Sequence, residues 1–314
     1  MLRDSLVFVA AVCFIAACLG DPVPDMAQAV LTNSYYITTW DLIGHGADHR
    51  PVENSAAGVE ALNYLDGTQT VAFVVHGRGG SAFSEFAYTL RDVLSQADQR
   101  SAVIVVDWSA VAASSYDHAR ALVPQVAQDL SNFIALMEAG QRLNRNLLHL
   151  IGFDLGAHVV GNASRNAVSR AMKITALSPA GEGWGPDSGG LQRTDAQFVE
   201  VIHTDAVGNR AFGMVATGLV RGVGTLDFFP NGATRQPGCS FFDNACYHNR
   251  AWQLFAATVQ MGGHLLGNRC DTLEQALNNR CIALGMAVMG SNQLVKISQG
   301  IYRVNTGRVW PYSP

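Results

Sequence analysis

The chain has 314 residues, 48% of them hydrophobic, with 21 basic and 25 acidic residues and a net charge of −4. A chain of this length and composition can bury one large core or two modest ones. Its balanced charge, without runs of one sign, excludes the basic footprint of a nucleic-acid-binding protein and offers no attraction to an anionic membrane surface.

The first predicted element is a secretory signal peptide. Arg3 precedes an apolar run over residues 6–17, and small residues follow as far as Gly20. An apolar run of about a dozen residues is typical of a signal peptide and too short to span a bilayer. We therefore expect residues 1–20 to be removed and residues 21–314 to form a secreted, single-domain protein without a transmembrane segment.

Strands and helices alternate in the next predicted region. Apolar residues at three- and four-residue intervals from Leu122 to Met137 predict a helix, and another helix is expected from Leu155 onward. Such alternation predicts a mostly parallel sheet with helices on both faces and a ligand site at the carboxyl ends of the strands. The predicted strands are short runs rich in β-branched residues, at 71–75, 102–106, 147–151, 173–177 and 198–202.

The third of these strands is followed by the sequence GFDLG at 152–156. This spacing is that of a nucleophile elbow, G-x-S-x-G, a tight strand-to-helix turn that presents a serine hydroxyl at the edge of the sheet. Here Asp154 occupies the serine position. The backbone amides of Leu155 and of Arg78, in the loop VVHGRGG at 74–80, would form an oxyanion hole beside it.

Further motifs follow in a fixed order: VIVVDWS, ALSPAG, DAQFVEVIHTD, LDFFPNG, QPGC and CYHNRA. Together with the elbow and VVHGRGG, they resemble the pancreatic lipase family, which includes triacylglycerol lipases, phospholipases A1 and the lipase-like yolk proteins of flies. The resemblance covers the chain from about residue 30 to near its end. It implies an α/β-hydrolase fold without the C-terminal β-sandwich of pancreatic lipases.

The resemblance also identifies three triad-equivalent positions, which run nucleophile, acid, histidine along the chain. They fall on Asp154, on Ser178 within LSPAG, and on His248 within CYHNR. Two of the three positions therefore carry a different type of side chain from the family's catalytic residue. Loss of triad members leaves only about 10³–10⁴-fold rate enhancement, and a carboxylate at Asp154 would repel the developing oxyanion. We predict a catalytically inactive homologue that binds or stores lipid or another hydrophobic ligand.

Three alternatives keep catalysis. A working lipase or phospholipase A1 is the competing class. In a mirrored triad Ser178 would be the nucleophile, but it is expected on the far side of His248 from the oxyanion hole. In the third alternative Asp154 attacks saturated carbon and forms an alkyl ester. That mechanism needs a second acid, for which Asp205 is a geometric candidate, although an acid in this segment is common in the family. Rebuilding the family triad requires both Asp154→Ser and Ser178→Asp on this interpretation.

Four cysteines remain after the predicted signal peptide. In a secreted chain they are expected to form disulfides, and three pairings are possible. A zinc site is disfavoured because no pair has C-x2-C spacing. The favoured pairing joins nearest neighbours, Cys239 to Cys246 and Cys270 to Cys281.

The resemblance implies that the loop between Cys239 and Cys246 is a lid over the site. It encloses only the six residues SFFDNA, so the lid resembles the short one of phospholipases A1. Phe241 and Phe242 within it are interpreted either as facing a ligand or as packing locally.

The sequence requires no cofactor. Family members hold calcium after the catalytic acid, and Asp187 and Asp195 could supply oxygens, but Gln192 replaces a third carboxylate and weakens such a site. Asn162 starts the only glycosylation sequon, and we expect it to be unmodified because it lies on the helix after the elbow. The sequence does not indicate the oligomeric state. Three further histidines are interpreted as structural: His76, His158 and His203.

Overall fold

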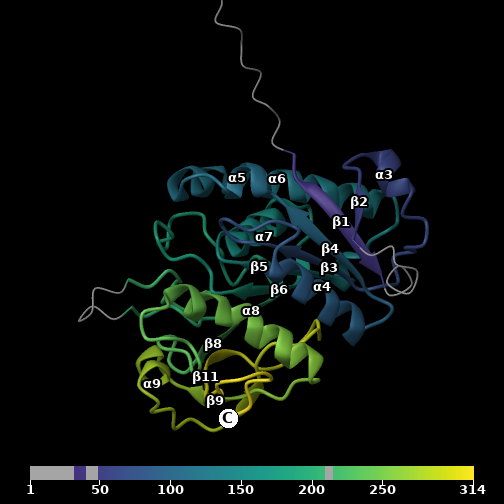
Figure 1. Cartoon of the computed structure of the whole chain (residues 1–314). Helices are drawn as coiled ribbons and strands as arrows, with labels where there is room; N and C mark the ends of the chain where they lie inside the picture. The colour runs from purple at the N-terminus through teal and green to yellow at the C-terminus, as the bar shows by residue number, and fades with distance from the viewer. Residues whose placement is uncertain (1–31, 40–48, 209–214) are drawn as a thin grey trace, which may run out of the picture. The chain divides into compact units, whose positions relative to one another are not determined.

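A sheet of 11 strands forms the centre of the fold (Figure 1). The computed structural model describes residues 32–39, 49–208 and 215–314, and the predicted signal peptide lies outside the described residues. The strands are β1 (Ser34–Thr39), β2 (Arg50–Val52), β3 (Val71–Val75), β4 (Ala102–Asp107), β5 (Leu148–Phe153), β6 (Ala171–Leu177), β7 (Ala196–Ile202), β8 (Leu226–Pro230), β9 (Leu266–Cys270), β10 (Met286–Val288) and β11 (Gly300–Val304).

The strands lie in the order β10-β9-β11-β8-β7-β6-β5-β3-β4-β1-β2. From β4 through to β11 in this order, neighbouring strands are parallel, whereas β1 and β2 at one edge and β9 and β10 at the other are antiparallel. All five strands predicted from the sequence are present. Every residue of β3 is buried, as expected for a parallel strand covered on both faces.

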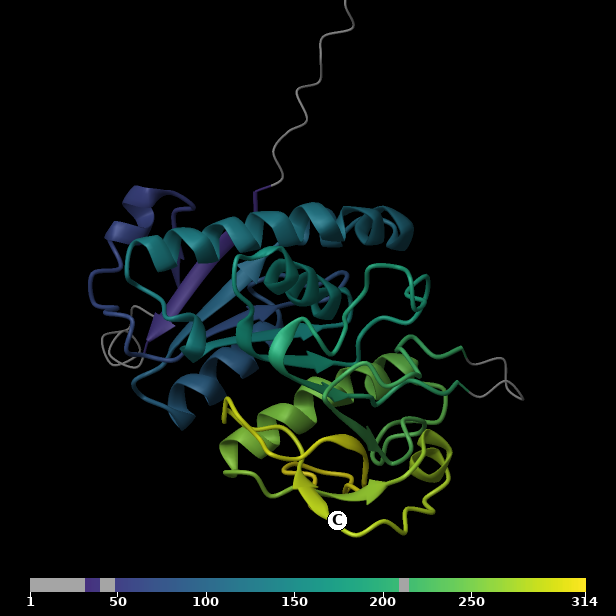
Figure 2. The same ribbon diagram turned by 180° about the vertical axis from the view of Figure 1, so that it is seen from behind.

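Helices cover both faces of the sheet (Figures 1 and 2). The helix α7 packs on β5 and β6, and α6 packs on the outside of α7. On the other face α4 and α8 pack against each other, so the architecture is that of an α/β-hydrolase fold. The helices are α3 (Ala56–Glu60), α4 (Glu85–Ala97), α5 (Ser109–Ala112), α6 (Tyr116–Ala139), α7 (Leu155–Asn166), α8 (Asn244–Gln260) and α9 (Leu273–Leu277).

The helix predicted from Leu122 begins earlier, at Tyr116. The side chain of Ser115 accepts a hydrogen bond from the His118 amide and so caps the first turn. Such a cap satisfies an amide that has no partner within the helix. The periodic apolar residues indicated the buried stripe of α6, whereas its start is set by this local polar contact.

A buried ion cluster links β6 and β7 to the segment that follows β10. Lys173 and Glu200 are both fully buried, and Lys173 Nζ lies 2.8 Å from Glu200 Oε2. Lys296 Nζ lies 2.6 Å from Glu200 Oε1. Burial lowers the pKa of Lys173 to about 8, although Glu200 acts in the opposite direction. One buried carboxylate therefore pairs with two ammonium groups, which leaves a surplus of one positive charge in the cluster.

Both disulfides have the nearest-neighbour pairing predicted from the sequence, Cys239 with Cys246 and Cys270 with Cys281. No described helix is long and apolar enough to cross a membrane.

Candidate active site

Asp154 lies at the turn between β5 and α7, in the position of an elbow nucleophile. Its φ of 55° and ψ of −120° lie in a region that residues other than glycine rarely adopt. The turn is possible because its neighbours are small: a Cβ on Gly156 would lie 2.4 Å from the carbonyl oxygen of Val75. Strained conformations of this kind cluster at functional sites, where the surrounding structure maintains them.

The carboxylate of Asp154 occupies the place of the predicted oxyanion hole. The amide of Arg78 donates a hydrogen bond of 2.9 Å to Asp154 Oδ2. A Cβ on Gly77 would lie only 2.6 Å from the Cβ of Asp154, so this loop approaches the elbow as closely as glycine allows. Burial opposes ionisation of Asp154, but His248 and the two hole amides outweigh it and lower the pKa of the carboxyl. At neutral pH the hole therefore holds an anion.

His248, on α8, lies between two carboxylates. Its Nε2 is 3.3 Å from Asp154 Oδ1, and its Nδ1 is 3.6 Å from Asp205 Oδ2. These contacts are ion pairs and not well-aligned hydrogen bonds. Burial would lower the pKa of His248, but Asp154 and Asp205 together raise it to about 9. The ring is consequently an imidazolium at neutral pH, with one net negative charge left on the cluster.

Asp205 is the second acid of the cluster. The sequence alone did not establish whether this carboxylate faces His248. It is 3% exposed and lies three residues beyond the end of β7. Its Oδ2 accepts a hydrogen bond of 3.0 Å from the amide of Thr217, and its carbonyl accepts one from Gly218. The backbone of a distant segment thus fixes this carboxylate beside His248. The only signal in the sequence was an acid shortly after a predicted central strand.

Ser178, the family's acid position, contacts a different partner. It has a φ of 39°, and its hydroxyl lies 2.9 Å from Thr204 Oγ1 and accepts from the Thr204 amide. Thr204 Oγ1 in turn donates to the backbone carbonyl of His248. Ser178 therefore braces the backbone near the histidine, whereas Asp205 faces the ring.

Aromatic residues line the histidine side of the cluster. The ring of Phe153 lies 4.9 Å from that of His248, and Phe86 packs behind it at 5.4 Å. Burial raises the pKa of Tyr116 to about 12, and the charge of Asp154 acts in the same direction. Aromatic rings therefore pack beside the histidine of the cluster.

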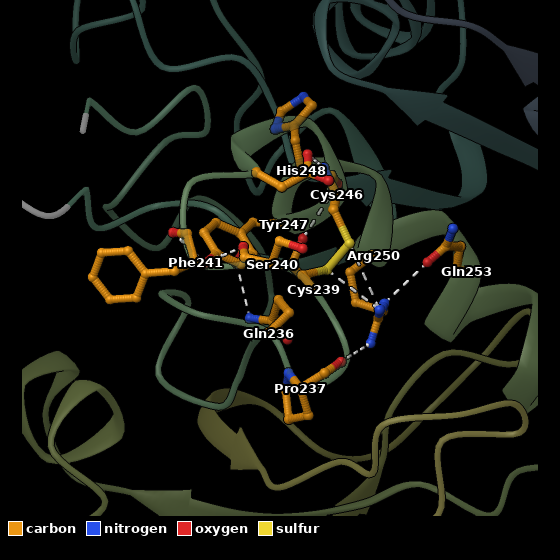
Figure 3. The surroundings of a disulfide bond; sticks show 12 residues. Gln236, Pro237, Cys239, Ser240, Phe241, Cys246, Tyr247, His248, Arg250 and Gln253 are labelled. Atoms are coloured by element: carbon orange, nitrogen blue, oxygen red, sulfur yellow. Dashed lines mark hydrogen bonds between the residues drawn. A yellow bond between two sulfur atoms is a disulfide. The ribbon is translucent and has the colours of Figure 1, made fainter.

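The loop between Cys239 and Cys246 is fixed by side chains that flank it (Figure 3). The hydroxyl of Tyr247 is 2.8 Å from the carbonyl of Ser240 and 2.7 Å from that of Phe241. The guanidinium of Arg235 lies over the Phe241 ring, so this phenylalanine packs locally. Phe242 is 72% exposed.

The residues considered for calcium are engaged elsewhere. Both carboxylate oxygens of Asp195 accept hydrogen bonds from Arg165, at 2.9 and 2.8 Å, and one also accepts from the amide of Gln192. Asp187 is exposed. A cation at Asp195 would have to displace the guanidinium, which does not favour a metal site here.

The side chain of Asn162 is engaged in the same region. Its Nδ2 donates to the carbonyls of His158 and Gly189, at 2.9 and 3.0 Å. Both hydrogens of the amide that would carry a glycan are used, which supports the expectation that Asn162 is unmodified.

The three histidines interpreted as structural all have local partners. His76 stacks on Trp108 and accepts from its amide. The ring nitrogens of His158 contact the carbonyl of Ala180 and the amide of Leu191. Those of His203 contact the carbonyl of Leu219 and the carboxylate of Asp227.

Comparison with known proteins agrees with this fold. The model of the Lipase family matches residues 50–299. The chain belongs to the lipase family. Lipase member H of Rattus norvegicus is 33% identical over 239 residues, which cover 72% of this chain and 50% of the relative. Pancreatic triacylglycerol lipase of Mus musculus is 30% identical over 204 residues, covering 58% of this chain and 43% of the relative. The chain thus spans about half the length of the curated relatives it matches.

Proposed function

We propose that this protein is a secreted member of the lipase family that does not hydrolyse carboxylic esters and instead binds a lipid or another hydrophobic ligand. The observation that carries the proposal is the hydrogen bond from the Arg78 amide to Asp154 Oδ2. The side chain at the nucleophile position thereby occupies the donors that an ester oxyanion needs.

Three features of the cluster oppose ester hydrolysis. Asp154 has no hydroxyl, and attack of its carboxylate on an ester carbonyl would give a reactive anhydride. Its charge repels the oxyanion of a tetrahedral intermediate. His248, with a pKa of about 9, carries a proton at neutral pH and cannot accept one from a nucleophile.

Exposed apolar side chains support a hydrophobic ligand. Phe83, in the loop after the Arg78 amide, is 54% exposed, and Phe242 is 72% exposed. Val215 is 79% exposed, and its carbonyl accepts from Asn244 at the start of α8. Secretion is supported by the two disulfides, which persist in oxidising compartments.

We expect the purified protein to show no turnover of short-chain esters or phospholipids above buffer, and to carry lipid that organic extraction and mass spectrometry detect. Phe242→Ser should reduce the extracted lipid several-fold. Ile297→Ser, which changes a fully exposed residue near the start of β11, should leave it unchanged. Steady ester turnover that disappears in His248→Ala would contradict the proposal, as would equal lipid loss in both serine variants.

A further inference from the structure

We infer that Asp154, His248 and Asp205 form a carboxylate-nucleophile triad that hydrolyses hydrophobic compounds at a saturated carbon bearing a leaving group, as in an alkyl halide or an epoxide. This activity goes beyond the proposed function. The two share only the requirement that a hydrophobic ligand binds near the elbow. It does not require hydrolysis of an ester substrate, because the only ester hydrolysed is the one that Asp154 itself forms.

The two oxygens of Asp154 have different surroundings. Oδ2 accepts from the Arg78 amide at 2.9 Å, which fixes it in the hole. Oδ1 faces His248 Nε2 at 3.3 Å, beyond the usual hydrogen-bond distance. One oxygen is thus anchored, while the other keeps lone pairs that are available for attack. Carboxylates attack saturated carbon productively because the product is a stable alkyl ester.

In the first step Asp154 Oδ1 forms a bond to the saturated carbon, and the bond from this carbon to the leaving group breaks. The leaving group departs with the electron pair of that bond. A halide leaves as its anion, and the proton of His248 passes to solvent. An epoxide oxygen remains attached to the neighbouring carbon and takes the proton instead.

Esterification then changes the state of His248. It removes the charge of Asp154, which is the larger cause of the raised pKa of the imidazole. Asp205 remains as the single carboxylate beside the ring, so the pKa falls toward its usual value. Neutral His248 can then remove a proton from water. His248 is therefore a charged ion-pair partner of Asp154 before the attack and a general base after it.

In the second step water adds to Asp154 Cγ as His248 takes its proton. The resulting oxyanion lies on Oδ2, to which the Arg78 amide already donates. Collapse breaks the bond between Cγ and the alkyl oxygen, and the alcohol takes a proton from His248. The regenerated carboxyl returns its proton to His248, so that one water is consumed and the starting state is restored.

Asp205 is a positioning residue in this scheme. Its carboxylate is held by the amide of Thr217 and lies 3.6 Å from Nδ1 of His248. It keeps the ring oriented once Asp154 is esterified and uncharged. Without it, the alkyl ester would form but its hydrolysis would slow.

The experiment traps the alkyl ester. His248→Gln keeps a side chain of similar size but removes the base, so the intermediate should accumulate. We would incubate it with decyl bromide and, separately, with the terminal epoxide of decene. Peptide mass spectrometry should find about one alkyl group per chain, on the peptide that contains Asp154. The bromide should label this variant without a proton donor. The epoxide needs the proton of His248 to open, so the epoxide is tested by turnover in the wild-type protein.

The wild-type protein should instead turn over at least one probe, and in oxygen-18 water it should gain the heavy isotope in the Asp154 carboxylate. Asp205→Asn should slow turnover and accumulate label on Asp154. Asp154→Asn should show neither label nor turnover, with an unchanged circular dichroism spectrum. Equal labelling of an exposed carboxylate such as Asp117 would overturn the inference, as would no bromide adduct in folded His248→Gln together with no epoxide turnover by the wild-type protein. Neither result would affect the absence of ester turnover or the extracted lipid.

Discussion

Replacing Asp154 with serine is expected to convert the protein into a weak esterase without any second substitution. The change removes the anion from the hole and frees the Arg78 amide, which now donates to Asp154 Oδ2. It also supplies the missing hydroxyl. His248 loses one of its two carboxylates, so its pKa falls and it can act as a base.

The single change suffices because Asp205 already lies beside the ring, 3.6 Å from Nδ1 of His248. An acid at that nitrogen fixes the tautomer and orientation that the mechanism needs. Ser178→Asp should add little, because residue 178 contacts Thr204 in this structure. Serine is shorter than aspartate, so its hydroxyl starts farther from Nε2 of His248 and must move closer to it in the substrate complex. We therefore expect modest turnover.

Hydrolysis of a short-chain ester by purified variants measures this prediction. Asp154→Ser should be active, and Asp154→Ala, which frees the hole without adding a hydroxyl, should not. Asp154→Ser combined with Asp205→Asn should lose activity by up to about 10⁴-fold. Activity that survives Asp205→Asn but requires Ser178→Asp would instead favour the family's usual acid position.

The largest loss of stability is expected from Glu200→Gln. Glu200 is fully buried and pairs with Lys173 at 2.8 Å and Lys296 at 2.6 Å. Its removal leaves two buried ammonium groups that face only carbonyls and an amide. Breaking a buried ion pair in this way costs about 3–5 kcal/mol of unfolding free energy. Urea denaturation followed by tryptophan fluorescence measures the change.

Lys173→Met provides the matched control. It removes the surplus positive charge and leaves Glu200 paired with Lys296 and hydrogen bonded to the Gly290 amide. The loss should therefore be clearly smaller than in Glu200→Gln. The cost of Glu200→Gln should also shrink as the pH rises toward about 8, because Lys173 in the variant lacks the carboxylate that raises its pKa and sheds its proton before the wild type does. Equal losses in both variants would mean that Glu200 does not bind the two lysines as described.

The sequence predicted the parts of the fold that local patterns determine. Apolar runs located the central strands, and the spacing of GFDLG located the turn that places Asp154 after β5. The loop at 74–80 supplies the amide of Arg78 where that pattern implied. These features depend on residues that are close in sequence or on one regular element.

The partners of His248 and Glu200 could not be settled in the same way. Asp205 faces the ring because amides of Thr217 and Gly218, a dozen residues further on, hold its carboxylate and its carbonyl. Glu200 meets a lysine 96 residues away. Such contacts follow from how the chain packs, and no local periodicity encodes them.

The charge of His248 also affects stability. Its pKa in the folded protein is about 9, above the ordinary value of 6.5. The bound proton therefore stabilises the fold fully below pH 6.5, and this contribution is lost as the pH rises through about 9. The charge of Asp154 stabilises the fold at neutral and high pH, because the pKa of this carboxyl is lowered in the folded protein. This stabilisation is lost only as the pH falls through the lowered pKa.

The most direct test of the charge-linked cluster is an NMR titration of the His248 ring in the wild-type protein. We predict a pKa of about 9, falling in Asp154→Asn and, separately, in Asp205→Asn, because each substitution removes one of the carboxylates beside the ring. A ring that titrates at or below 6.5 in the wild type, or that is unaffected by either substitution, would contradict the account.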